Sequence, residues 1–170
     1  MTKILMCVLC CLLLSGCILV SQTPLVKEQN GIMALKPFGT QFTMWNWQSG
    51  AWSREAGLLN LAAVGRHYET KNQKDKMEIL FAALKPGWWI MQVEAKNSQA
   101  RYSFLEVEEK AGELVLHPIL CKDLAKLAEA KPVVDFVKND CLAKPTIGLG
   151  LFKTLAGMPM SPMIKLVPEK

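Results

Sequence analysis

Six cysteines and two histidines are among the residues of this sequence that can act as nucleophiles, general bases or metal ligands. A thiolate forms thioethers and disulfides, and imidazole is the usual general base near neutral pH. Cys7, Cys10, Cys11 and Cys17 lie near the start, whereas the other two cysteines and both histidines lie in the body of the chain. The two groups therefore predict two kinds of chemistry.

The start of the chain has the order of a secretory signal peptide. Met1-Thr2-Lys3 supplies a positive charge, and residues 4–14 are eleven consecutive apolar residues. Small Ser15 and Gly16 then precede Cys17. Eleven helical residues span about 16 Å, roughly half of a hydrocarbon core of about 30 Å, so the segment is too short for a permanent membrane span.

The sequence Leu14-Ser15-Gly16-Cys17 resembles the bacterial lipobox. The resemblance covers only the start of the chain, and it implies a lipoprotein signal peptide over residues 1–16 that is cut just before Cys17. In that family the cysteine sulfur carries a diacylglyceryl group, and the freed amine is acylated with a fatty acid such as palmitate. Two or three acyl chains hold a protein stably on a membrane. The alternatives are an uncleaved anchor that continues through Val20 and an ordinary cleavage that releases a soluble protein.

The residue after Cys17 bears on localisation. It is Ile18, and Asp is absent there. By resemblance to the enterobacterial sorting rule, this favours the outer membrane, facing the periplasm, over the inner membrane. The rest of the chain is then expected in an oxidising compartment beside a bilayer.

Cys121 and Cys141 remain as an even pair once the leader and the lipidated cysteine are set aside. An oxidising compartment favours a disulfide between them. A catalytic or metal-binding pair is the alternative, but zinc sites use four ligands at close spacing, and only His117 lies near. We therefore predict a structural disulfide, with no metal and no cofactor.

An enzyme would need a nucleophile, a base and an orienting group. His67 and His117 are the two available imidazoles, and neither lies in a recognisable nucleophile motif. Neither Gly-x-Ser-x-Gly nor a phosphate-binding glycine loop is present. A small periplasmic hydrolase therefore ranks behind a non-enzymatic domain.

Five tryptophans are the one unusual enrichment. Trp45, Trp47 and Trp52 lie close together, and Trp88 and Trp89 are adjacent. In strands the first two face the same side, while the adjacent pair faces opposite sides. The set predicts either core and rim packing or a binding platform for an apolar ligand, a glycan or a partner protein. The candidate binding aromatics are Trp45, Trp47, Trp52 and Trp88.

The charge pattern argues against nucleic acid as a partner. The net charge is +5, but the 20 basic and 15 acidic residues are interspersed, whereas a nucleic-acid binder shows a clustered basic stripe. Residues 66–76 are the most basic stretch, interrupted by Glu69 and Asp75. This stretch predicts a solvated turn between strands, with contact to an anionic surface as the alternative.

Segments up to about residue 120 favour strands, because β-forming or alternating runs are separated by turn residues such as Gln48-Ser49-Gly50 and Lys110-Ala111-Gly112. The expected strands are 42–47, 58–62, 66–70, 77–84, 88–94, 101–108 and 113–118. Residues 122–130 and 146–156 have apolar residues at helical spacing.

We therefore expect an α+β fold: an antiparallel sheet or small open barrel of about five to seven strands, followed by one or two short helices pinned by the disulfide. The expected organisation is a signal peptide over 1–16, a lipidated N-terminus and tether over 17–31, a globular domain over 32–157 and an extended tail over 158–170.

The leading functional hypothesis is a membrane-anchored envelope lipoprotein with a small non-enzymatic binding or structural domain, whose partner is an envelope protein. The second is a carrier of a lipid or other apolar ligand in a β-rich cavity. The strands with Gly-Trp-Trp-Ile-Met-Gln and Arg-Tyr-Ser-Phe, ahead of two cysteines, also loosely resemble small uncharacterised bacterial lipoproteins. That resemblance implies no activity.

The first prediction concerns the lipid anchor. Replacing Cys17→Ser removes the thiol that is acylated, so the protein should move from detergent extracts into the soluble periplasm or stay uncleaved. Membrane fractionation and the mass of the processed amino terminus measure this. Unchanged partition and an unmodified wild-type terminus would contradict the lipoprotein assignment.

Overall fold

The computed structural model describes residues 18–71, 76–95, 102–137, 140–156, 158 and 160–169. Of these residues 54% lie in strands and 12% in helices. The expected signal peptide and Cys17 lie outside the described residues, so their assignment stays a prediction. In the described part of the chain, no helix is both long and apolar enough to cross a membrane.

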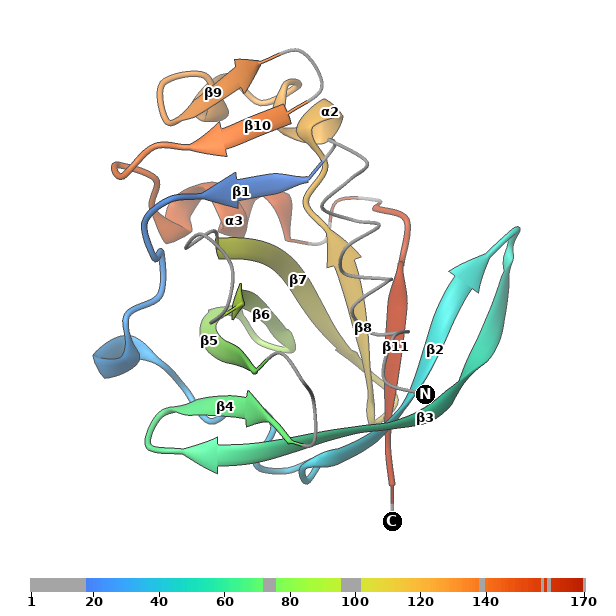
Figure 1. The fold of residues 1–170 in the computed structure, drawn as a ribbon. Helices are drawn as coiled ribbons and strands as arrows, with labels where there is room; N and C mark the ends of the chain where they lie inside the picture. The colour runs from blue at the N-terminus through green and yellow to red at the C-terminus, as the bar shows by residue number, and fades with distance from the viewer. Residues whose placement is uncertain are drawn as a thin grey trace.

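A closed antiparallel barrel of eight strands forms the centre of the molecule (Figure 1). Its strands are β2 (Gln41–Gln48), β3 (Ala51–Val64), β4 (His67–Thr70), β5 (Met77–Lys85), β6 (Trp88–Ala95), β7 (Tyr102–Lys110), β8 (Glu113–Pro118) and β11 (Ile164–Pro168). Strands β2 to β8 each pair with the next one along the chain, except that β8 pairs with β11. Strand β11 also pairs with β2, which closes the ring.

Tight turns connect neighbouring barrel strands. Ser49 and Gly50 have φ of 50° and 86°, and Ala111 and Gly112 have φ of 53° and 78°. Two-residue hairpin loops with positive φ at both positions match the right-handed twist of the strands. The predicted turns at these positions are confirmed, and each predicted strand before Cys121 corresponds to all or part of a barrel strand.

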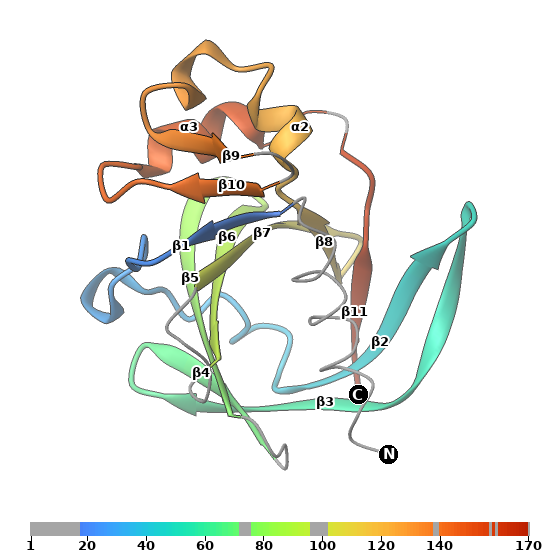
Figure 2. The same cartoon turned by 45° about the horizontal axis from the view of Figure 1, so that its top comes forward.

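Three further strands extend the sheet beyond β7. These are β1 (Leu19–Ser21), β10 (Asp140–Ala143) and β9 (Val134–Val137). Strand β1 pairs antiparallel with β7 and parallel with β10, and β10 pairs with β9. Figures 1 and 2 place this extension and the helices at one side of the barrel, away from β4.

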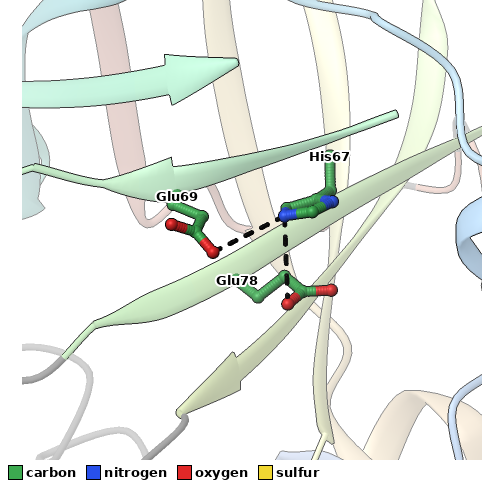
Figure 3. Close-up of side chains that lie close together, drawn as sticks. All are labelled: His67, Glu69 and Glu78. Atoms are coloured by element: carbon green, nitrogen blue, oxygen red, sulfur yellow. Dashed lines mark ion pairs between the residues drawn. The ribbon is translucent and has the colours of Figure 1, made fainter. Parts of the chain in front are cut away.

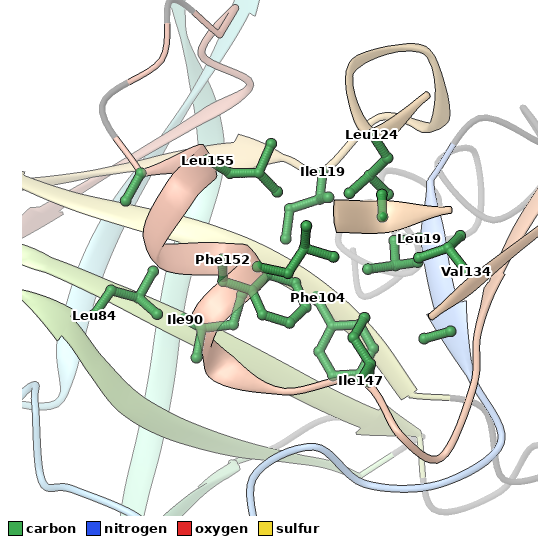
Figure 4. Packing of buried hydrophobic residues seen from close by; sticks show 14 of the residues in the cluster. Leu19, Leu84, Ile90, Phe104, Ile119, Leu124, Val134, Ile147, Phe152 and Leu155 are labelled. Carbon is green, nitrogen blue, oxygen red and sulfur yellow. The ribbon is translucent and has the colours of Figure 1, made fainter. Parts of the chain in front are cut away.

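Two apolar cores share the strands β5, β6 and β7. One core fills the barrel, where Phe81, Met91 and Leu105 are buried. The other lies outside it, where Ile90 and Phe104 pack beneath α3 (Leu149–Leu155) together with Phe152 (Figure 4). The ring centroids of Phe104 and Phe152 are 5.9 Å apart. Because both faces are covered, β5 and the first half of β6 read as apolar runs rather than as a simple alternation.

The expected α+β class is wrong. The helical spacing after Cys121 produces only α2 (Cys121–Leu124), the 3-10 turn η2 (Ala128–Ala130) and the seven-residue α3. Strands β9, β10 and β11 follow α2 along the chain, and β11 is a barrel strand. The expectation failed because it gave residues 158–170 no strand, whereas the barrel closes through a strand near the C-terminus.

Parts of the expected tether and tail lie in the sheet. Leu19–Ser21, within the segment 17–31, forms β1, and Leu19 and Ser21 are fully buried. Ile164–Pro168, within the tail 158–170, forms β11. Strand pairing with distant residues orders both segments, although their local sequences favour irregular structure.

The predicted disulfide between Cys121 and Cys141 is confirmed. Its Cα atoms are 5.5 Å apart, and it joins α2 to β10. Cys141 is fully buried in the outer core. The bond therefore fixes the extension of the sheet and not the barrel itself.

Removing this disulfide should destabilise the extension. The bond closes a loop with a sequence separation of 20, which corresponds to about 3 kcal/mol in the chain-entropy model. The double replacement C121A/C141A should lower the free energy of unfolding in urea by about that amount, and reduced wild-type protein should behave alike. An unchanged unfolding midpoint in both samples would contradict the assignment.

Candidate binding groove on the outer face of the barrel

The interior of the barrel holds a cavity of about 50 Å³. Its lining is wholly apolar and includes Met44, Met77 and Met91. An eight-stranded barrel is just wide enough to be filled by side chains or to hold one small ligand, so the fold is compatible with a small binding domain or with a carrier of an apolar ligand. Because ligand pockets commonly measure about 300–1,000 Å³, this cavity belongs to a packed core.

A larger groove lies on the outer face of the barrel. Its volume is about 450 Å³, which is within the usual range for a small-molecule site. We call it the tryptophan groove because Trp47 and Trp52, on either side of the β2–β3 turn, form one wall. The remaining lining comes from β7, β8, β11 and the residues beside them: Glu108, Lys110, Ala111, Glu113, Val115, His117, Pro162 and Lys165.

Strand register brings these side chains together. Lys165 on β11 lies opposite Trp45 on β2 and opposite Val115 on β8. Val115 lies opposite Glu108 on β7, and Glu108 lies opposite Trp88 on β6. Residues opposite one another in a sheet project to the same face. One row therefore crosses five neighbouring strands, although its members are far apart in the sequence.

The aromatic side chains of the groove pack around Lys165. The Trp47 and Trp52 rings meet edge to face, with centroids 5.1 Å apart. The Nζ atom of Lys165 lies 5.3 Å from the centroid of Trp45 and 5.4 Å from that of Trp52. The same Nζ atom is 3.2 Å from a carboxylate oxygen of Glu113. These contacts hold the rings in place, and Trp47 still exposes 38% of its surface.

His117 borders the groove as a buried imidazole. Its ring stacks on Trp88 with centroids 5.7 Å apart, and its Nε2 atom lies 3.4 Å from an oxygen of Glu108. Burial lowers the pKa of His117 below its usual value, although the Glu108 carboxylate opposes this shift. The imidazole is therefore neutral near pH 7. The described lining contains no Ser, Thr or Cys for this base to activate.

Glu106 is a buried acid beside His117 that sequence inspection missed. It lies opposite His117 in the β7–β8 pair and is fully buried. Within the part of the chain that the structure describes, neither carboxylate oxygen has a hydrogen-bond partner. Burial raises the pKa of Glu106 to about 8, and the charge of Lys85 opposes the shift. In the sequence Glu106 looks like the polar residue of an alternating strand. Only the outer core, which covers the same face of β7 at Phe104, makes it a buried group.

The tryptophans and histidines singled out in the sequence lie partly in the tryptophan groove and partly outside it. Trp47 and Trp52 line the groove, while Trp45 and Trp88 contact its lining residues Lys165 and His117. The expectation that Trp88 and Trp89 face opposite sides is confirmed, since Trp88 packs on the outer core and Trp89 on the barrel core. His67 lies on β4, outside the groove.

Buried Glu106 should make stability depend on pH. An unfolded glutamate releases its proton above its ordinary pKa of 4.5, whereas folded Glu106 keeps it up to about 8. The folded state thus binds more protons in this window, and the free energy of unfolding should fall as pH rises, by up to about 1.4 kcal/mol per pH unit. His117 acts in the opposite sense around and below its ordinary pKa of 6.5, so the contribution of Glu106 dominates in the window from about pH 7 to 8.

Urea unfolding across that window measures the effect. Glu106→Gln cannot ionise and should flatten the pH dependence, whereas Glu109→Gln, at an exposed position of the same strand, should keep it. Equal slopes for wild type and E106Q would show that Glu106 does not hold its proton in the folded protein.

Comparisons of the chain with protein-family models, with curated proteins and with solved structures find no match. The groove, with its aromatic wall and mixed charges, is thus the basis for assigning a function.

Proposed function

We propose that this chain is an exported lipoprotein, anchored to the outer membrane through Cys17, whose barrel binds a neutral saccharide in the tryptophan groove. The single observation that carries the binding proposal is the groove itself. It combines a partly exposed aromatic wall with charged hydrogen-bonding groups in a volume of about 450 Å³.

The charges of the groove favour an uncharged ligand. Lys110 and Lys165 supply two positive charges, and Glu108 and Glu113 supply two negative charges. His117 adds none near pH 7 because burial lowers its pKa. The charges cancel, so long-range attraction selects neither anions nor cations.

The kinds of groups in the groove favour a saccharide over an apolar molecule. Carboxylates accept hydrogen bonds and ammonium groups donate them, and sugar hydroxyls can do both. The flat carbon–hydrogen faces of a sugar ring match an indole surface such as that of Trp47. An apolar ligand would remove these partly exposed charged groups from water without offering them hydrogen bonds, which costs free energy on binding.

The position of β1 is compatible with a membrane anchor at Cys17. Ile18 bridges to Leu120, and the next residue begins β1, so an anchored cysteine would attach directly beside the extension of the sheet. Strands β7, β8 and β11 separate β1 from the β2–β3 hairpin that carries Trp47 and Trp52. In both views the hairpin and β1 lie on different sides of the barrel (Figures 1 and 2). The groove can therefore stay accessible in an anchored protein.

Calorimetric titration with neutral oligosaccharides built from glucose or N-acetylglucosamine tests the binding proposal. Saturable binding by the processed protein is expected. Trp47→Ala and Trp52→Ala should each weaken it at least tenfold, because each removes part of the aromatic wall. Phe136→Ala, which truncates an aromatic 40% exposed on β9 and outside the groove, should leave the affinity unchanged.

Two outcomes would contradict the proposal. One is the absence of binding by any neutral oligosaccharide at millimolar concentration. The other is saturable binding of a hydrophobic dye that W47A and W52A leave unaffected, together with an enlarged cavity inside the barrel. That result would favour a carrier that holds its ligand in the barrel cavity.

A further inference from the structure

A second cluster of polar side chains lies on strands outside the groove. His67 and Glu69 alternate along β4 and so face the same side, and Glu78 on β5 lies directly opposite Glu69 (Figure 3). The Nε2 atom of His67 is 3.6 Å from an oxygen of Glu69 and 4.0 Å from an oxygen of Glu78. One ligand atom from each residue lies within 4.8 Å of the other two.

The two carboxylates of this cluster lie close to the imidazole and are partly buried. Glu69 and Glu78 lie directly opposite one another on paired strands, and both are only about one fifth exposed. Carboxylate oxygens and an imidazole nitrogen are ligands that zinc accepts in proteins.

His67 points its Nε2 atom at this position. The residue is 8% exposed, and among the described residues its buried Nε2 atom has no hydrogen-bond partner. Its Nδ1 atom lies 3.3 Å from an oxygen of Glu28, on the opposite side of the ring. When Nδ1 donates its hydrogen to Glu28, the lone pair of Nε2 is directed between Glu69 and Glu78. Metal-binding histidines in proteins are oriented by an outer carboxylate in this way.

Local contacts place Glu28, whose side chain is 60% exposed, beside His67. It begins the 3-10 turn η1 (Glu28–Asn30), which docks on the β3–β4 hairpin through a 2.5 Å hydrogen bond from Arg66 to the carbonyl of Gln29. A Cβ atom at Gly65 would lie 2.8 Å from the Glu28 carboxylate, so glycine leaves the room that this side chain occupies. The outer carboxylate is thus positioned by an element nearly forty residues before the histidine.

We propose that His67, Glu69 and Glu78 bind a divalent transition-metal ion of the zinc class, with Glu28 as the carboxylate that orients the imidazole. Ligand atoms about 2.0–2.2 Å from a tetrahedral ion lie about 3.3–3.6 Å apart. The two distances from Nε2 of His67, 3.6 and 4.0 Å, are close to that spacing, and all three ligand atoms lie within 4.8 Å of one another. One nitrogen and two carboxylate ligands favour zinc and its neighbours over Mg²⁺ and Ca²⁺, which prefer oxygen ligands alone. Three protein ligands leave a fourth position open. The site does not depend on the saccharide proposal.

Zinc titration of chelator-treated protein tests this site, using competition with a chromophoric chelator. Wild type should bind one Zn²⁺ in preference to Ca²⁺ or Mg²⁺. His67→Gln and Glu69→Gln should each weaken binding more than 100-fold, and Glu28→Gln should weaken it about 10- to 100-fold through the outer carboxylate. Glu109→Gln, an exposed glutamate on another strand, should bind as the wild type does.

Nuclear magnetic resonance of the two imidazoles provides a second measurement that does not require a variant. Zn²⁺ should shift the ring signals of His67 and leave those of His117, in the groove, in place. Circular dichroism checks that E69Q is folded. The proposal is overturned if wild type binds no Zn²⁺ at millimolar concentration, if E69Q and H67Q bind it normally, or if the His67 signals do not move. His67 would then serve only as a polar contact of the three glutamates.

Discussion

The pairing of β11 with both β2 and β8 is the interaction on which the rest of the structure depends. A sheet that ended at β2 and β8 would expose two edges of unpaired backbone groups, which invite pairing with other chains. Strand β11 satisfies both edges and closes the barrel around its apolar interior. The same strand places Lys165 between Trp45 and Val115. Closure of the fold and assembly of the groove therefore come from one element of five residues.

The outer core adds a second constraint. Strands β5 to β7 carry apolar side chains on both faces, so α3 and the extension of the sheet must cover the outer one. That cover removes Glu106 from water and raises its pKa to about 8. The Cys121–Cys141 disulfide fixes part of the cover, because it joins α2 to β10. Burial of a carboxyl group is thus a consequence of how a non-barrel layer packs on the barrel.

The interior and the exterior of the barrel differ in what they can bind. The interior is wholly apolar, and its free volume of about 50 Å³ is that of a packed core. Polar and aromatic groups converge instead on the outer face, in the tryptophan groove and in the cluster around His67. Both arise where cross-strand register aligns side chains from neighbouring strands, and the two use different strands. In an eight-stranded barrel with a filled centre, the outer face is where recognition can take place.

The sequence by itself determined the local features of this protein. Backbone conformation predicts the turns at Ser49-Gly50 and Ala111-Gly112, and strand alternation predicts the opposite faces of Trp88 and Trp89. The number of cysteines predicts the disulfide. These are properties of neighbouring residues or of composition. The tertiary structure alone decided the closure by β11, the burial of Glu106 and the approach of Glu28 to His67. Each of these depends on strand register or packing between segments far apart in the chain, and local propensity carries no information about which distant segment will supply the partner.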